Sequence, residues 1–152
     1  MEMKTFICQV CGHVAFEQAP VDCPVCNSAI ENFENDPDAI TKPADPDNLS
    51  ETDRIHIPKI VLAKTCTLGH QPDCVTAHVT VGENEHVMES EHFIHFMDFY
   101  LDQKYISRIM LTPKNNYPTA DLHFSLARGT LAVITHCNVH GSWISTVRLD
   151  KE

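Results

Sequence analysis

The chain has 152 residues, 43% of them hydrophobic and 21% charged, and a net charge of −10. This length suffices for one ordinary domain and a small module, and no apolar run approaches the ~20 residues of a membrane-spanning helix. The acidic balance lacks the basic footprint of nucleic-acid-binding proteins, so the sequence predicts neither a membrane nor a nucleic acid as partner.

The cysteines and the start of the chain both bear on the compartment. Met1–Phe6 leads directly into the first cysteine without a signal-peptide core, so we expect a cytoplasmic protein. There, clustered cysteines bind metal or do redox chemistry more often than they form disulfides. Cys66 and Cys74 could pair under oxidation or remain free thiols, and we assign them no site.

Residues 1–35 contain two C-x-x-C pairs separated by eleven residues. Each pair can wrap one side of a tetrahedral ion, and Gly12 and Asn27, which follow the pairs, tolerate the left-handed backbone of such turns. Two copies without a βαβ context argue against a redox C-x-x-C and favour a tetrathiolate site. Iron and zinc fit four sulfurs equally well. The expected ligands are Cys8, Cys11, Cys23 and Cys26.

Residues 36–53 are expected to be an extended linker. Three prolines stand among polar residues, which leaves too little apolar surface for a core. Residues 31–53 carry −7 of the net charge, which is typical of a solvated segment and could also guide a basic partner.

Residues 54–152 form the main domain, and their pattern favours strands. Residues 75–81 alternate apolar and polar side chains with a period of two. Residues 93–101 are long enough for a helix, but a turn at 102–104 and a second β-rich run favour a hairpin. The expected strands are 57–62, 75–81, 93–101, 105–111, 122–126, 130–135 and 143–149, with a loop over 112–121. Six or seven short strands predict an all-β fold, an immunoglobulin-like β-sandwich or barrel.

A second metal site is indicated in the main domain. Cys137 and His140 lie three residues apart on a turn with Asn138 and Gly141, so one turn can direct both side chains to one ion. Three upstream histidines complete the candidate set: His56, His86 and His92. One sulfur and four nitrogens are too many ligands for a closed tetrahedral zinc site. They suit an iron ion with one coordination position left open.

The other histidines are not assigned to this site. On strands, His95 and His136 would point away from His92 and Cys137, respectively. Surface or core-edge roles are expected for the remaining histidines, which stand alone in the sequence: His13, His70, His78 and His123.

Five short motifs that contain the candidate ligands or flank them follow one another along the main domain. They are His56-Ile57-Pro58, Val81-Gly82, His86-Val87-Met88, Glu91-His92-Phe93-Ile94 and Cys137-Asn138-Val139-His140-Gly141-Ser142-Trp143. In these motifs the main domain resembles the superoxide reductases, the neelaredoxin and desulfoferrodoxin family. Through Ala19-Pro20, Cys23-Pro24-Val25-Cys26 and Phe33, the first segment resembles the rubredoxin-like domains attached to rubrerythrins.

The resemblance implies a function and a ligand arrangement. An iron ion cycling between Fe2+ and Fe3+ would reduce superoxide to hydrogen peroxide, with Cys137 as its axial ligand. Its equatorial ligands would be His56, His86, His92 and His140. A rubredoxin or similar protein would donate electrons, with rubredoxin-like iron on the same chain as a possible relay, and the chain would form a homo-oligomer. The alternatives are a non-catalytic iron carrier or oxidant sensor, and a zinc-filled binding module.

Two charges that the family commonly carries are missing here. The family has Glu-Lys before the first histidine of the site, where this chain has Arg54 and Ile55. We expect Arg54, ahead of Lys59 or Lys64, to supply positive potential to an approaching anion. The alternative is an exposed arginine at the start of a strand.

Overall fold

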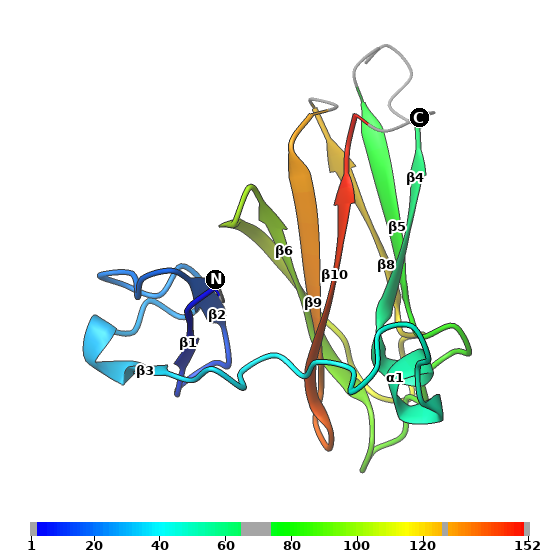
Figure 1. Ribbon diagram of the computed structural model, residues 1–152, viewed down its shortest axis with the longest axis horizontal. Helices are drawn as coiled ribbons and strands as arrows, with labels where there is room; N and C mark the ends of the chain where they lie inside the picture. Colours follow the sequence, from blue (N-terminus) through cyan, green and yellow to red (C-terminus); the bar gives the residue numbers. More distant parts are fainter. Residues whose placement is uncertain (1–2, 65–73, 126–127, 151–152) are drawn as a thin grey trace.

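The computed structural model describes residues 3–64, 74–125 and 128–150. A small N-terminal sheet is joined by a linker to a β-sandwich, beside which it lies (Figure 1). Within the described residues, no helix has the length and apolar character needed to cross a membrane.

The N-terminal sheet has three short antiparallel strands in the order β2-β1-β3. They are β1 (Thr5–Cys8), β2 (Val14–Phe16) and β3 (Phe33–Asn35), with a 3-10 turn η1 (Ile30–Asn32) before the last. Gly12 and Asn27 have φ values of 79° and 64°, so both turns after the C-x-x-C pairs use the left-handed backbone that the sequence predicts.

The main domain is a sandwich of two antiparallel sheets, ordered β10-β9-β6-β7 and β4-β5-β8. Its strands are β4 (Pro58–Ala63), β5 (Val75–Val81), β6 (Ile94–Leu101), β7 (Lys104–Met110), β8 (Thr119–Phe124), β9 (Thr130–Cys137) and β10 (Gly141–Arg148). The core between the sheets contains the alternating valines of β5 and, from the facing sheet, Met97, Phe99 and Val133. The all-β prediction is therefore confirmed.

Two local predictions were wrong. Arg54 does not begin a strand, because a six-residue helix, α1 (Glu51–His56), starts within the segment expected to be extended. Ser50 and Asp53 form a capping box, in which each side chain accepts a hydrogen bond from the other residue's backbone amide. The loop predicted over 112–121 ends early, because β8 begins at Thr119.

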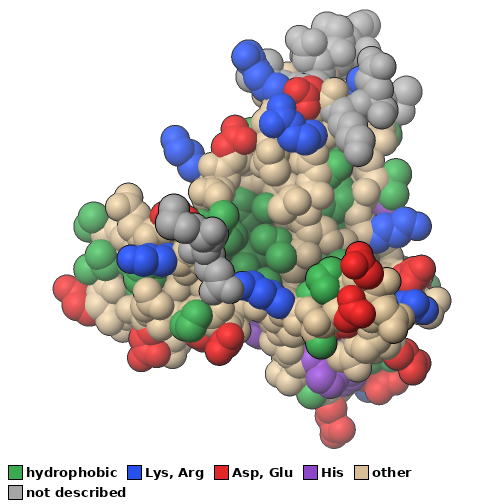
Figure 2. Space-filling model, in the orientation of Figure 1, with side chains coloured by type: hydrophobic (Ala, Val, Ile, Leu, Met, Phe, Trp, Pro, Cys, Tyr) green, Lys and Arg blue, Asp and Glu red, His purple; other side chains and the backbone are tan. Residues whose placement is uncertain are grey.

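A second apolar cluster lies between the N-terminal sheet and the sandwich. Val14 of β2 packs with Tyr100 of β6 and Ile134 of β9. Ala39 and Ile40 of the linker are buried in the same cluster, so this part of the linker is docked and not merely extended. Figure 2 shows apolar side chains in the hollow beside this junction. The N-terminal sheet is therefore held against one face of the sandwich.

Gly82→Ala is expected to destabilise the fold strongly. Gly82 has a φ of 89°, and an added β-carbon would lie 2.4 Å from the Asn84 carbonyl oxygen and 2.6 Å from that of Ile55. Both obstacles are backbone atoms beside the segments that carry two histidines of the candidate site. We expect a loss of about 2 kcal/mol or more in the free energy of unfolding, measured by chemical denaturation.

Gly141→Ala is the matched control. Gly141 has a φ of 87°, but the nearest atom to an added β-carbon is the Thr41 hydroxyl at 3.8 Å. We therefore expect a loss of only about 1 kcal/mol in the free energy of unfolding, because alanine adopts the left-handed backbone less readily than glycine. Equal losses in the two variants would contradict the steric explanation.

Candidate metal centres

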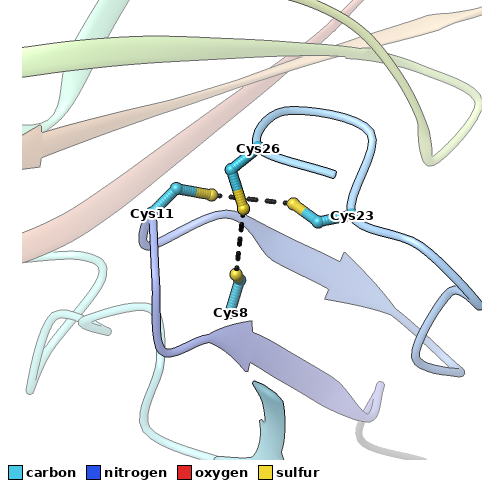
Figure 3. Close-up of side chains that lie close together, drawn as sticks. All are labelled: Cys8, Cys11, Cys23 and Cys26. Atoms are coloured by element: carbon cyan, nitrogen blue, oxygen red, sulfur yellow. Dashed lines mark hydrogen bonds between the residues drawn. The ribbon is translucent and has the colours of Figure 1, made fainter. Parts of the chain in front are cut away.

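The four N-terminal cysteines converge on one point (Figure 3). Cys8 ends β1, Cys11 lies in the turn after it, and Cys23 and Cys26 come from the second loop. We call these four residues the four-cysteine site. The sulfurs of Cys8 and Cys26 are 3.7 Å apart, and those of Cys11 and Cys23 are 3.6 Å apart. Metal–sulfur bonds of about 2.3 Å at tetrahedral angles place the sulfurs roughly 3.8 Å apart, so the quartet fits one zinc or iron ion.

Hydrogen bonds around the sulfurs favour their ionised form at one edge of the site. The Ser28 hydroxyl lies 3.3 Å from the Cys8 sulfur and 3.1 Å from the Cys26 sulfur. The Ser28 side chain and backbone lower the pKa of Cys26 to about 6, whereas burial raises the pKa of Cys23. Thiolates are the metal-binding form of cysteine, so these contacts support ion binding.

Four imidazoles form a closed circle at one end of the sandwich. Neighbouring ring centroids are 4.7 to 4.9 Å apart, in the order His56, His86, His92 and His140. The opposite pair His56 and His92 is 6.4 Å apart. Bonds of about 2.1 Å from nitrogen to a central ion would put opposite centroids roughly 6.5 Å apart. The circle therefore has the size needed to hold one ion.

Cys137 lies at this circle, at the end of β9. Its sulfur is buried, and the ligand atoms of His56, His86, His92 and Cys137 all lie within 4.8 Å of one another. His140 lies beside them, with Nδ1 3.6 Å from the Cys137 sulfur. The His140 backbone amide also donates to that sulfur at 3.4 Å. We call these five residues the histidine–cysteine site.

The hydrogen bonds of the imidazoles show that the site is suited to a cation. The Nδ1–H groups of His56 and His86 donate to the carbonyls of Thr52 and Val87, both at 2.7 Å. Their Nε2 atoms therefore present lone pairs to each other at 3.2 Å, which is repulsive unless a cation lies between them. The Nε2 of His92 is buried and has no hydrogen-bond partner among the described residues. An orphaned buried nitrogen at this position is explained by a metal ligand.

Burial favours the neutral form of two of these imidazoles, His56 and His86. It lowers the pKa of His86 to about 4, and it lowers the pKa of His56, with smaller effects from His140 and His92. Neutral imidazole is the form that binds a metal. With one thiolate and four nitrogens, the donor set suits iron, and the histidine–cysteine site is an iron site.

The local backbone fixes each of these side chains. His56 ends α1, whose capping box sets where the helix begins. His86 follows the turn at Gly82, and its amide donates to the Val81 carbonyl. Asn138 accepts a hydrogen bond from the Phe93 amide at 2.8 Å and donates to the Glu91 carbonyl at 3.1 Å. This clamp joins the segment bearing His92 to the turn bearing Cys137.

Other residues considered in the sequence make contacts outside the circle of imidazoles. Arg54 is on α1, half exposed, with Nε 3.9 Å from a Glu83 carboxylate oxygen. His78 pairs with Asp121 on the exposed face of β5 and β8. Ring contacts tie His95 to Phe96 and His136 to Phe96, outside the circle. Cys66 and His70 lie outside the described residues.

Sequence reasoning missed a buried polar cluster between the two parts of the chain. Arg108 of β7 donates to both carboxylate oxygens of Asp98 on β6, at 2.5 and 2.8 Å, and to the Cys11 carbonyl at 2.9 Å. His13, expected at the surface or a core edge, is 2% exposed and lies 3.2 Å from Asp98. We call Asp98, Arg108 and His13 the junction cluster. The sequence alone does not show this pair, because Asp98 and Arg108 become neighbours only when β6 pairs with β7.

Comparisons with known proteins agree with this geometry. Residues 48–146 match the desulfoferrodoxin family model, and residues 6–34 match the model of the rubrerythrin rubredoxin-like domain. No curated protein matches the chain.

Solved superoxide reductases share the fold. The enzyme from Nanoarchaeum equitans is 27% identical, with a TM-score of 0.52 over 62% of this chain and 93% of its own. A variant of the Ignicoccus hospitalis enzyme (neelaredoxin) is 23% identical, with a TM-score of 0.54 over 64% of this chain and 81% of its own. A variant of the Archaeoglobus fulgidus enzyme is 21% identical, with a TM-score of 0.53 over 66% and 93%. Since the desulfoferrodoxin model matches more than half of the chain, the protein belongs to the desulfoferrodoxin family and carries a rubredoxin-like N-terminal domain.

Proposed function

We propose that this protein is a superoxide reductase. One superoxide anion, one electron and two protons would yield one hydrogen peroxide at the histidine–cysteine site. The observation that carries the proposal is the closed circle of four imidazoles with a buried thiol beside it. Support also comes from membership of the desulfoferrodoxin family and from the similar superoxide reductases.

The proposed ligands have separate tasks. Iron bound there supplies the electron. His56 and His86 would bind it through Nε2, because their Nδ1 atoms are committed to carbonyls. His92 would bind through its unpartnered Nε2 and His140 through Nδ1, which faces the Cys137 sulfur. Cys137 would supply the sulfur ligand, and the hydrogen bond from the His140 amide would tune the basicity of that sulfur.

Trp143 supports the circle from one side. Its ring stacks on His56 with centroids 5.2 Å apart and an angle of 20°, and it is 4% exposed. This packing fixes the plane of one imidazole and excludes water from behind it. We infer that Trp143 orients His56.

Arg54→Ala is expected to slow the capture of superoxide modestly. The guanidinium is exposed on α1, two residues before His56, and its loose pair with Glu83 offsets part of its charge. We expect a decrease of about twofold to threefold at low salt that disappears at high ionic strength. The measurement is the second-order rate constant for superoxide decay, with Lys104→Ala, at the far end of β6 and β7 from Cys137, as the matched control. A rate constant unaffected by Arg54→Ala at every ionic strength would remove Arg54 from the mechanism.

The product yield tests the proposed reaction. Protein reduced under anaerobic conditions is mixed with a pulse of superoxide, and the amount of hydrogen peroxide formed is measured. A superoxide reductase gives one peroxide for each superoxide consumed, whereas dismutation gives one for every two. A non-catalytic iron carrier or oxidant sensor would react once and not turn over with an electron donor. A zinc-filled module would be colourless and inert.

The remaining expectations stay predictions. The electron donor is proposed to be of the rubredoxin type. A cytoplasmic location, a homo-oligomer, and boundaries at residues 35 and 53 are carried over from the sequence. Size-exclusion chromatography with light scattering measures the oligomer directly.

A further inference from the structure

We propose that the four-cysteine site is the built-in electron donor of the histidine–cysteine site, and that Phe96 and His136 form the contact path between them. This inference rests on the proposed function, and it names the partner that reduces the iron. The path is built from four consecutive contacts or bonds across the junction.

The path starts in the turn that carries Cys11. Gly12 follows Cys11 directly, and a β-carbon on Gly12 would lie 3.5 Å from the Phe96 Cζ atom. The gap between Gly12 and the Phe96 ring is therefore about the width of one methyl group. The direct contact runs through Arg108, which donates to the Cys11 carbonyl at 2.9 Å and lies 3.6 Å from the centroid of the Phe96 ring. A larger side chain at this position would push the two domains apart.

The path continues through two stacked rings. Phe96 of β6 and His136 of β9 are cross-strand partners. Their centroids are 4.9 Å apart and their planes differ by 12°. His136 is bonded to Cys137 through a single peptide unit, and its Nδ1 lies 2.9 Å from the Ser142 hydroxyl. From the Cys11 carbonyl to Cys137, the route contains one hydrogen bond to Arg108, two contacts of the Phe96 ring and one peptide link.

The junction cluster fixes this path in place. The guanidinium of Arg108 lies 3.6 Å from the centroid of the Phe96 ring and hydrogen-bonds the Cys11 carbonyl. Arg108, Phe96 and His136 thus form a stack of three planar groups. The Tyr100 hydroxyl donates to the Val14 carbonyl at 2.7 Å, and the Thr41 amide donates to the Ser142 carbonyl at 2.7 Å. Both the N-terminal domain and the linker are therefore tied to the sheet that carries Cys137.

The redox step is a single electron transfer in which no bond forms or breaks. The four-cysteine site gives up one electron, so its iron is oxidised from Fe2+ to Fe3+. The iron at the histidine–cysteine site is reduced from Fe3+ to Fe2+. The rings are not oxidised; their bonded and touching atoms shorten the distance that the electron must cross through empty space. An external donor of the rubredoxin type would then reload the four-cysteine site.

The test follows the two visible chromophores without superoxide. Protein with iron in both sites is fully oxidised, and a photoreductant then supplies less than one electron per molecule. We expect first-order equilibration between the sites, with a rate constant that does not change on dilution. Phe96→Leu and His136→Leu should each slow it by about tenfold or more with unchanged optical spectra.

Two matched variants separate the path from general damage. Phe16→Leu makes the same change at an aromatic residue of this junction that contacts Tyr100 and lies off the path. His136→Phe loses the hydrogen bond to Ser142, as His136→Leu does, but keeps a stacked ring. Both should stay within about twofold of the wild-type rate constant. Amide exchange of residues 11–15 in zinc-loaded protein measures docking apart from any redox reaction.

Several results would overturn the relay. They are a rate constant proportional to protein concentration, equal rates in Phe96→Leu and Phe16→Leu, or zinc filling the four-cysteine site of protein expressed with ample iron. The proposed function fails in a different way, because reduced protein would then leave superoxide unconsumed while the two sites still equilibrate.

Discussion

Cys137→Ser is expected to remove the visible thiolate-to-iron band of the main domain and most formation of peroxide. A serine hydroxyl is a much weaker donor than a thiolate, and its position is buried beside His140. Loss of groups that merely surround a metal ligand costs roughly 10- to 100-fold in activity or affinity. Loss of the sulfur ligand itself should cost at least that much. The measurement is the rate constant for pulse-generated superoxide, together with the optical spectrum.

Cys26→Ser is the reciprocal control. Cys26 belongs to the four-cysteine site, so its replacement should remove the spectrum of that site and leave the thiolate band of the main domain unchanged. Metal analysis of both variants then shows which ion is lost. If superoxide disappears equally fast with Cys137→Ser, the thiolate has no role in the reaction.

The sequence predicts most of the sandwich because one face of nearly every strand is buried against the other sheet. Apolar and polar side chains alternate over Val75–Val81, which indicates a strand with one buried face, and β5 spans these residues. Residues 93–101 were harder to assign, since a helix and a strand both fitted. The structure explains why: β6 is buried on both faces, with the sandwich core on one side and the N-terminal domain on the other.

Six of the nine candidate metal ligands could be predicted because their spacing is local, whereas His56, His86 and His92 were placed by the order of motifs shared with the resembled family. Two C-x-x-C pairs and the Cys137-Asn138-Val139-His140 turn each place ligands within one turn of backbone. The helix at Glu51–His56 was missed although Ser50 and Asp53 form a capping-box pattern, because the surrounding prolines and charges suggested an extended linker.

The junction cluster has no local pattern. His13 and Asp98 are 85 residues apart, and only the pairing of β6 with β7 brings Arg108 opposite Asp98. A single acidic residue within an apolar strand, such as Asp98, could indicate a buried partner of opposite charge, since charged residues are seldom buried unless paired. Periodicity assigns such a residue to a face, but it does not identify the partner on another element.

Asp98→Ala is expected to cause a large loss of stability, because it removes one partner of a buried ion pair. The Asp98 side chain is 1% exposed and that of Arg108 is 7% exposed. Removal of the carboxylate leaves the guanidinium buried without its counter-charge, and His13 also loses a partner. Breaking a buried pair in this way costs about 3–5 kcal/mol. The measurement is the free energy of unfolding of zinc-loaded protein by chemical denaturation.

The same variant tests whether the two domains are one mechanical unit. Because Arg108 also holds the Cys11 carbonyl, its displacement should release the four-cysteine turn and raise amide exchange over residues 11–15. The double variant Asp98→Leu/Arg108→Met replaces the pair with apolar groups and should recover much of the lost stability, since no charge stays buried. Asp150→Ala, which removes an exposed pair with Arg148, should change nothing measurable. If Asp98→Ala is no more harmful than Asp150→Ala, the junction cluster does not hold the domains together, and the contact path through Phe96 loses its support.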